Sequence, residues 1–247
     1  MLILNPHIFK QFSEISFGFI TKAGAEINDL FHFNMSYSVG DKKENVDENQ
    51  AQFFRQLGLT SNKVAFQKQV HEDKIFVVEK GGNCGESDAL LTTKKSLGLA
   101  ISTADCPAIF IYDRRKKIIC GVHSGWRGTR KRILERAVLK LTDQFNSDPA
   151  DLYCYIAPSI SRVNYEVSEE VAEQFNEKDL CKKDGRYFLD LVGANYRMLI
   201  NCGVKESQIQ VSQLCTFEFS SVFHSYRRWG KESGRALAVI AMKDMNE

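Results

Sequence analysis

Apolar and polar positions alternate along this chain in a pattern that predicts many short strands and several amphipathic helices. Strand-like runs occupy residues 74–79, 96–102, 108–112, 117–122, 152–156, 208–212 and 236–242. The polar tetrad at 113–116 separates two of these runs and predicts a hairpin. Helical spacing of apolar residues recurs over 45–57, 133–145, 169–176 and 191–201, with Gly58 and Gly203 as stop signals. The pattern predicts an α+β fold with mixed sheets, in a single domain covering residues 1–247.

Charge and composition exclude several classes of protein. The sequence has 33 Lys and Arg against 31 Asp and Glu, a balance that argues against a nucleic-acid-binding protein. No apolar run approaches the roughly 18–20 residues that would span a membrane. The first residues lack the basic and apolar segments of a secretion signal, so we expect a cytoplasmic protein. The seven cysteines form no CxxC pair, which predicts reduced thiols.

Three residues near predicted strand ends have the side chains that zinc prefers: His71, Cys106 and His123. A catalytic zinc keeps three protein ligands and one open position, which these three would supply. Their spacing alone leaves two alternatives, namely two hydrogen-bonded histidines with a buried thiol, or a Cys106 nucleophile with His123 as its base. His7 and His32 have no local pattern, and we expect both to be structural.

Other polar residues near these motifs have both a functional and an ordinary interpretation. Asp105 is a candidate base or orienting group, or merely the cap of a turn. Arg127, in the Gly125–Gly128 turn before a helix, is a candidate anion-binding residue, while the same turn could simply pack Trp126 in the core. The run Tyr226–Trp229 could stack on a ligand or form an exposed rim.

Taken together, several separated motifs resemble the bacterial laccase-domain, or polyphenol oxidase, family, whose members are regarded as zinc-dependent purine nucleoside phosphorylases. The motifs are Gln69–His71, Asp88–Thr92, Thr103–Pro107, His123–Gly128, Cys215–Thr216, Ser225–Arg228 and Gly234–Arg235, preceded by Phe33–Ser36, Val39–Asp41 and Asn49. They appear in the family's order and extend from about residue 18 to residue 235.

The resemblance implies that His71, Cys106 and His123 bind one zinc ion. It also implies an α/β/β/α layered sandwich and phosphorolysis of adenosine, inosine and 5′-methylthioadenosine, with an accompanying adenosine deaminase activity. The partners would be a purine nucleoside and phosphate, and the protein would be a monomer or homodimer. Within this interpretation Asp105 is the candidate proton shuttle and Arg127 the phosphate ligand.

Asn34 and Arg227 are weaker candidates for ribose or phosphate contacts. Two segments depart from the family pattern. Ala157–Ser161 stands where the family has Gly-Pro-Cys-Ile-Gly, and Ser124 replaces the commoner alanine beside His123. If the first of these loops shapes the pocket, specificity would differ.

Competing functions use the same residues. A multicopper oxidase needs more imidazoles than the five histidines provide, although one copper ion at this site would support weak phenol oxidation. A cysteine hydrolase using Cys106 and His123 is the alternative enzyme. A metal-dependent interaction module would need a closed site with a fourth ligand, for which Cys120 and Cys84 are the available thiols.

Overall fold

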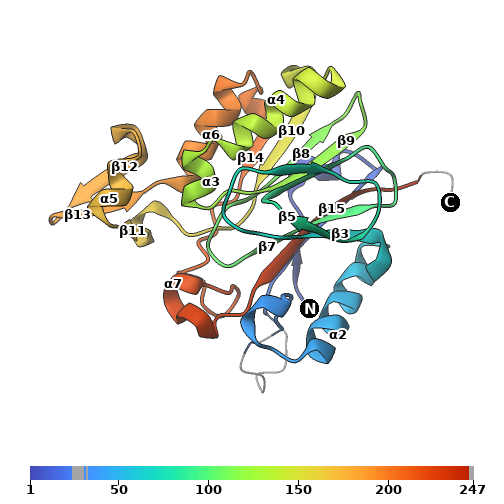
Figure 1. Cartoon of the computed structure of the whole chain (residues 1–247), viewed down its shortest axis with the longest axis horizontal. Helices are drawn as coiled ribbons and strands as arrows, with labels where there is room; N and C mark the ends of the chain where they lie inside the picture. Colours follow the sequence, from blue (N-terminus) through green and yellow to red (C-terminus); the bar gives the residue numbers. More distant parts are fainter. Residues whose placement is uncertain (24–30, 32, 245–247) are drawn as a thin grey trace.

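Two six-stranded sheets pack face to face at the centre of the computed structural model, which describes residues 1–23, 31 and 33–244 (Figure 1). The first sheet has the order β1 (Ile3–Leu4), β2 (Ile15–Ile20), β15 (Ala236–Met242), β7 (Gly98–Thr103), β3 (Val64–Lys68) and β5 (Gly82–Glu86). The second has the order β14 (Ile209–Val211), β10 (Leu152–Ile156), β8 (Ala108–Asp113), β9 (Ile118–His123), β6 (Ala89–Thr92) and β4 (Ile75–Val77). Both contain parallel and antiparallel pairs, which confirms the predicted α+β fold with mixed sheets.

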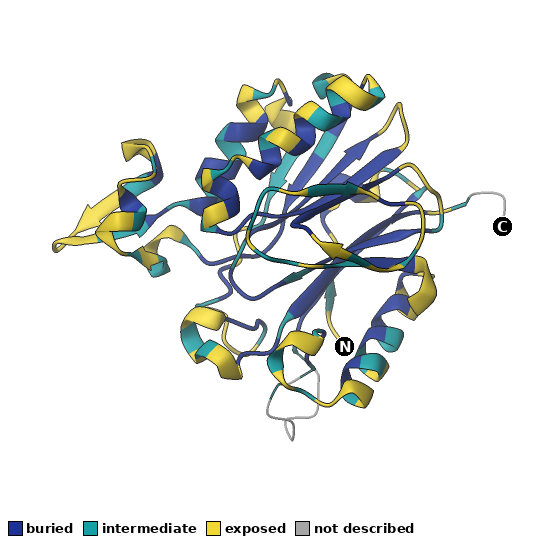
Figure 2. Cartoon of the chain, in the orientation of Figure 1, coloured by how far each residue is buried: buried dark blue, intermediate teal, exposed yellow. Residues whose placement is uncertain are grey.

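The central strands are buried on both faces. Every residue of β8, β9 and β15 is buried, and these strands form the dark centre of the molecule in Figure 2. One face of each sheet meets the other sheet through side chains such as Phe17, Phe110 and Ile240. Because the opposite face is covered as well, these strands read as continuous apolar runs rather than as alternating ones.

Helices cover the two outer faces of the sheet pair. On the second sheet lie α4 (Ile133–Phe145) and α6 (Leu191–Asn201), and on the first lies α2 (Lys43–Gln56) (Figure 1). Along α4 the buried residues recur at intervals of three and four, which places them on one face toward the sheet. The layers therefore follow the order helix, sheet, sheet, helix, and the predicted layered sandwich is confirmed.

Short elements complete the structure. Four short helices are α1 (His7–Lys10), α3 (Trp126–Arg130), α5 (Glu169–Ala172) and α7 (Tyr226–Trp229). A small third sheet consists of β11 (Glu166–Val167), β13 (Arg186–Leu189) and β12 (Leu180–Lys183), and it projects from one side of the molecule in Figure 1. Across the described residues, no helix combines the length and apolar character needed to cross a bilayer. All seven cysteines are unpaired thiols.

Most predicted elements are present, and two predictions were wrong. The expected helix 169–176 ends at Ala172, because the amides of Gln174 and Phe175 bond three residues back and Asn176 begins a separate 3-10 turn. The Gly125–Gly128 turn is instead the start of α3, since the amide of Thr129 donates to the carbonyl of Gly125. The apolar pattern missed β2, β3, β5 and β6. His32 lies outside the described residues.

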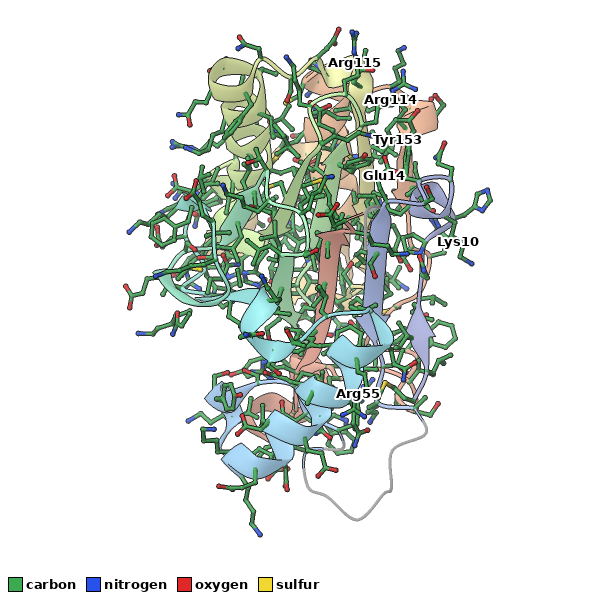
Figure 3. All side chains as sticks on the ribbon, turned by 90° about the vertical axis from the view of Figure 1, so that its right-hand side faces the viewer. Lys10, Glu14, Arg55, Arg114, Arg115 and Tyr153 are labelled. Carbon is green, nitrogen blue, oxygen red and sulfur yellow. The ribbon has the colours of Figure 1, made fainter. Side chains whose placement is uncertain are left out.

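Glu14 links the two sheets through a partly buried cluster of polar side chains. Its carboxylate accepts hydrogen bonds from the Tyr112 hydroxyl at 2.6 Å and from Lys117 Nζ at 2.7 Å. Figure 3 shows Glu14 on the same side of the molecule as Tyr153 and Arg114. Burial by itself would raise the pKa of Glu14, but the hydrogen bonds from Lys117 and Tyr112 outweigh it and lower the pKa to about 2.

Replacing Glu14 with glutamine is expected to lower the free energy of unfolding at pH 7 by about 1–2 kcal/mol, with solvent screening reducing the full effect. A carboxylate whose pKa falls from 4.5 to about 2 on folding stabilises the protein above pH 4.5. That stabilisation disappears as the pH drops through 2, so the difference between the two proteins should shrink below pH 4.5. Urea unfolding at pH 7, 4 and 3 measures it. The exposed Glu48→Gln variant is the control, and a difference that stays constant with pH would contradict the assignment.

Candidate metal centre and active site

Loops that pass between the two sheets bring the predicted metal-ligand residues together. His71 lies in the connection from β3 to β4, and Cys106 lies in the connection from β7 to β8. His123 is the last residue of β9, where it pairs with Ala108 at the start of β8. Since Cys106 is two residues before Ala108, the hairpin register alone places it beside His123.

The three side chains form a compact cluster. One ligand atom from each of His71, Cys106 and His123 lies within 4.8 Å of the others, and the two imidazole rings meet edge to face with centroids 4.8 Å apart. A Cβ atom at Gly125 would lie 3.1 Å from Cys106 Sγ and 3.1 Å from the His71 ring, so glycine is needed there for close approach. The donor set and its spacing fit a small cation that prefers nitrogen and sulfur ligands.

Electrostatics favour the thiolate form of Cys106. Burial by itself would raise the pKa of the thiol, but hydrogen bonds and charge interactions with His123 and His71 outweigh burial and lower it below its ordinary value. For His123, burial opposes the charged form, yet the contacts with Asp88 and Cys106 raise its pKa above the ordinary value. A thiolate is the form that binds a metal or attacks an electrophile.

Asp88 is a buried carboxylate that holds both histidines. Its Oδ1 lies 2.7 Å from Nδ1 of His123 and accepts from the backbone N–H of His71 at 3.1 Å. Its Oδ2 accepts from the N–H groups of Val70 at 3.1 Å and Glu72 at 2.8 Å. Three consecutive amides thus surround one carboxylate, and His71 has a left-handed backbone with a φ of 61°. The contact at Nδ1 leaves Nε2 of His123 for a metal.

Sequence reasoning missed Asp88 as a site residue, although it lies in one of the recognised motifs. A signal was present in the sequence, because this aspartate immediately precedes the apolar run Ala89–Leu91. In the structure its side chain is 0% exposed. An aspartate at such a place must find donors within the protein.

Asp105, the predicted proton shuttle, lies beside Cys106 with a left-handed φ of 95°. Its Oδ1 accepts from the hydroxyl of Thr216 at 2.6 Å. Its Oδ2 accepts from the hydroxyl of Ser225 at 3.0 Å and from the amide of Arg227 at 2.7 Å. The carboxylate therefore ties the Cys106 loop to two segments that are distant in sequence, at a strained backbone position of the kind that clusters at functional sites.

A cavity of about 750 Å³ opens next to the cluster. Its lining includes His71, Asp105, Cys106, His123, the arginines Arg127, Arg227 and Arg235, and the aromatic residues Trp126, Tyr165 and Tyr226. Arg127 and Arg227 are thus brought to the predicted site. Asn34 is fully buried instead, and its side chain bonds to Ser36, Asp41 and the amide of Arg235.

The two departures from the family pattern lie behind the site. The amide of Ile160, within Ala157–Ser161, donates to the carbonyl of Asp105, and this loop is not among the residues lining the cavity. The Ser124 hydroxyl lies 2.9 Å from that of Thr129 and donates to Asn195 Oδ1 at 2.8 Å. This buried network attaches α3 to α6.

The thiols considered as fourth ligands do not join the cluster. Cys120 is fully buried in the layer between the second sheet and its helices. Cys84 lies in β5 and donates to the carbonyl of Gly82. Within the described part of the chain, His71, Cys106 and His123 are the only His, Cys, Asp or Glu side chains that lie close enough together to hold one metal ion. An open coordination position would face the cavity.

Comparison with known families assigns the chain. Residues 16–243 match the family described as multi-copper polyphenol oxidoreductase laccase. The chain belongs to this laccase family. The matched region contains the whole cluster and the arginines of the cavity. It also contains Asp88, which the family resemblance had placed in a motif without a role.

Several curated relatives of this laccase-family chain carry one name. A purine nucleoside phosphorylase of Bacteroides thetaiotaomicron is 29% identical over 96% of this chain and 95% of its own length. Purine nucleoside phosphorylase YlmD of Bacillus subtilis is 31% identical, covering 94% of this chain and 90% of its own. A purine nucleoside phosphorylase of Deinococcus radiodurans is 35% identical over 82% of this chain and 79% of its own.

Solved structures of laccase-family proteins share the fold. The hypothetical protein YfiH of Bacillus licheniformis superposes with a TM-score of 0.92 at 29% identity, over 98% of this chain and 96% of its own. YlmD of Geobacillus stearothermophilus gives a TM-score of 0.89 at 28% identity, over 94% of this chain and 93% of its own.

Proposed function

We propose that this protein is a zinc-dependent purine nucleoside phosphorylase. The observation that carries the proposal is the His71, Cys106 and His123 cluster, whose ligand atoms lie within 4.8 Å of one another beside a cavity lined by three arginines. Full-length relatives at 29–35% identity bear the phosphorylase name. The partners would be a purine nucleoside and inorganic phosphate, with adenosine, inosine and 5′-methylthioadenosine as substrates and deamination of adenosine as a side activity.

In this proposal His71, Cys106 and His123 hold the zinc ion, which would supply Lewis acidity at the floor of the cavity. Arg127 binds the phosphate dianion and holds it for attack on C1′ of the ribose. The Arg127 side chain stacks on Trp126, with the guanidinium carbon 4.3 Å from the ring centroid, and this contact restricts the cation to the cavity wall.

The contacts of Asp105 support a positioning role, because its oxygens hold the Cys106 loop against Thr216, Ser225 and the Arg227 amide. A proton-shuttle role in deamination would require one of these donors to be released. Arg227 contributes to binding of the ribose or its phosphate.

A product assay tests the proposal. Purified protein of known metal content is incubated with adenosine, with and without phosphate, and adenine, inosine and ribose 1-phosphate are quantified. Adenine that forms only with phosphate, and disappears after chelation of zinc, is the expected result. Zinc-loaded protein that forms neither adenine nor inosine would overturn the nucleoside assignment.

A second candidate is a cysteine hydrolase, favoured by the lowered pKa of Cys106 next to His123. The two functions separate cleanly, since a thiol enzyme keeps its activity when metal is chelated. Copper bound by the same three residues is the other variant, and it would give weak oxidation of phenols in place of phosphorolysis.

Replacing Arg127 with glutamine is expected to raise the KM for phosphate about 10-fold or more, because one charge-assisted contact is lost. The KM for adenosine should change less than about 2-fold, as the nucleoside is uncharged. Arg130→Gln is the matched control, since Arg130 lies on the same helix and lines a different cavity. Equal effects of the two variants would show that only the overall charge matters.

A further inference from the structure

Three arginine side chains give the active-site cavity a net positive charge, against which Asp105 and the Cys106 thiolate are the anionic groups of the lining. Its lining contains Arg127, Arg227 and Arg235, while Asp105 is the one carboxylate among the lining residues. Both oxygens of Asp105 are already occupied by protein donors. Lys68, the remaining cation of the lining, is paired with Glu86 at 2.8 Å. A bound metal ion would increase this positive charge.

The three arginines lack acidic partners within the part of the chain that the structure describes, where the ion pairs involve other arginines. Each instead lies against an aromatic ring: Arg127 on Trp126, Arg227 on Tyr165 at 5.1 Å, and Arg235 on Tyr226 at 5.4 Å. Stacking holds a guanidinium in place and leaves its charge uncompensated.

Arg227 and Arg235 are also fixed by backbone carbonyl groups. Nη2 of Arg227 donates to the carbonyl of Glu166 at 2.8 Å. Nη1 of Arg235 donates to the carbonyls of Ser233 at 2.6 Å and Gly234 at 3.1 Å. A guanidinium has five N–H donors, so these contacts orient each side chain and leave further donors for a ligand.

Arg235 has the least solvent of the three. It is half-buried, and burial lowers its pKa, although the negative charges of Cys106 and Asp105 act in the opposite direction. Its backbone is clamped by Asn34, which accepts from the Arg235 amide at 3.0 Å. Keeping a desolvated cation without an acidic partner is costly unless a ligand supplies the negative charge.

The arginines come from different elements. Arg127 belongs to α3, which follows β9, whereas Arg227 belongs to α7 and Arg235 precedes β15.

A cavity of about 750 Å³ lies in the upper part of the range for ligand sites, roughly 300–1,000 Å³. There is therefore room for a nucleoside together with two anionic groups.

We propose that Arg227 and Arg235 form a second anion subsite, separate from Arg127, which binds a phosphate carried by the nucleoside itself. Purine nucleoside 5′-monophosphates are then ligands of this cavity. The inference rests on the proposed nucleoside specificity, and it adds a charged group to the class of molecule recognised.

Calorimetric titration of the zinc-loaded protein with inosine 5′-monophosphate and with inosine, in buffer free of phosphate, tests this inference. The monophosphate should bind at least about 10-fold more tightly than the nucleoside, as expected for charge-assisted contacts. Arg235→Gln should remove most of that advantage and leave the inosine affinity within about 2-fold, and Arg227→Gln should remove most of the advantage as well. Arg235→Lys keeps the charge but loses the planar set of N–H donors, so its affinity advantage for the monophosphate should lie between those of the wild-type protein and Arg235→Gln.

Two further variants separate the outcomes. Arg130→Gln, outside the cavity, should preserve the advantage, and Arg127→Gln should preserve it as well because Arg127 belongs to the other subsite. An equal loss in Arg127→Gln would mean a single shared anion site, and equal affinities in the wild-type protein would mean none; either result overturns the inference. Binding is measured without turnover. A protein that binds the monophosphate but does not cleave nucleosides would overturn the proposed function alone.

Discussion

Replacing Cys106 with alanine is expected to abolish stoichiometric zinc binding and to reduce phosphorolysis at least about 100-fold, since even residues behind the ligands cost 10–100-fold. The thiolate is the single anionic member of the cluster, and its pKa is already lowered by His123 and His71. Zinc content by mass spectrometry of the metal, together with the rate of adenine release, measures both effects.

Cys181→Ser is the matched control for that variant, because Cys181 is an exposed thiol in β12. It should retain zinc and activity. Full phosphorolysis by metal-free Cys106→Ala protein would rule out both the zinc mechanism and the thiol mechanism. Loss of activity with zinc retained would instead support Cys106 as the nucleophile.

Replacing Asp88 with asparagine is expected to weaken zinc binding about 10–100-fold and to lower phosphorolysis with it. The amide offers one acceptor oxygen where the carboxylate now accepts from three backbone N–H groups and contacts His123 Nδ1. Its NH₂ group would face donors, so the His71 loop and the His123 ring would both lose their fixed orientation. Competition with a chromophoric zinc chelator gives the affinity.

Asp113→Asn provides the comparison for Asp88. Asp113 is also a fully buried aspartate, and its Oδ1 accepts from the amides of Arg115 and Lys116 at the hairpin, away from the cluster. We expect this variant to lose thermal stability while its zinc affinity stays within about 2-fold. If both variants lowered the zinc affinity equally, general destabilisation would explain the result and the positioning role of Asp88 would be refuted.

Local sequence pattern was sufficient for the elements with a single strong period. The helices over 133–145 and 191–201 have the predicted bounds, because their buried positions recur at helical spacing. The hairpin of β8 and β9 was also predicted, since a polar tetrad separates two apolar runs. Strands such as β5, with glycine at Gly82 and Gly85 and no buried position, have no comparable period. Such strands form through pairing with a neighbour.

The candidate site likewise combines contacts that are local in sequence with contacts that only the tertiary fold makes. The hairpin register links Cys106 with His123 through the pairing of Ala108, a relation that is local in sequence. His71 reaches them only because its loop and the Cys106 loop both cross from one sheet to the other. Asn34, predicted as a ligand contact, is buried instead, and its Oδ1 accepts from the Arg235 amide.

By itself, the sequence determined the class of fold, the identity of the three ligand-type residues and the family, because these depend on residue type and local periodicity. Only the tertiary structure decided that Asp88 holds both histidines, that Asp105 is enclosed by three donors, and that Arg235 lies in the cavity. These contacts join segments up to 122 residues apart. Local propensity cannot specify them, since they arise when burial of the sheet faces fixes where each loop ends.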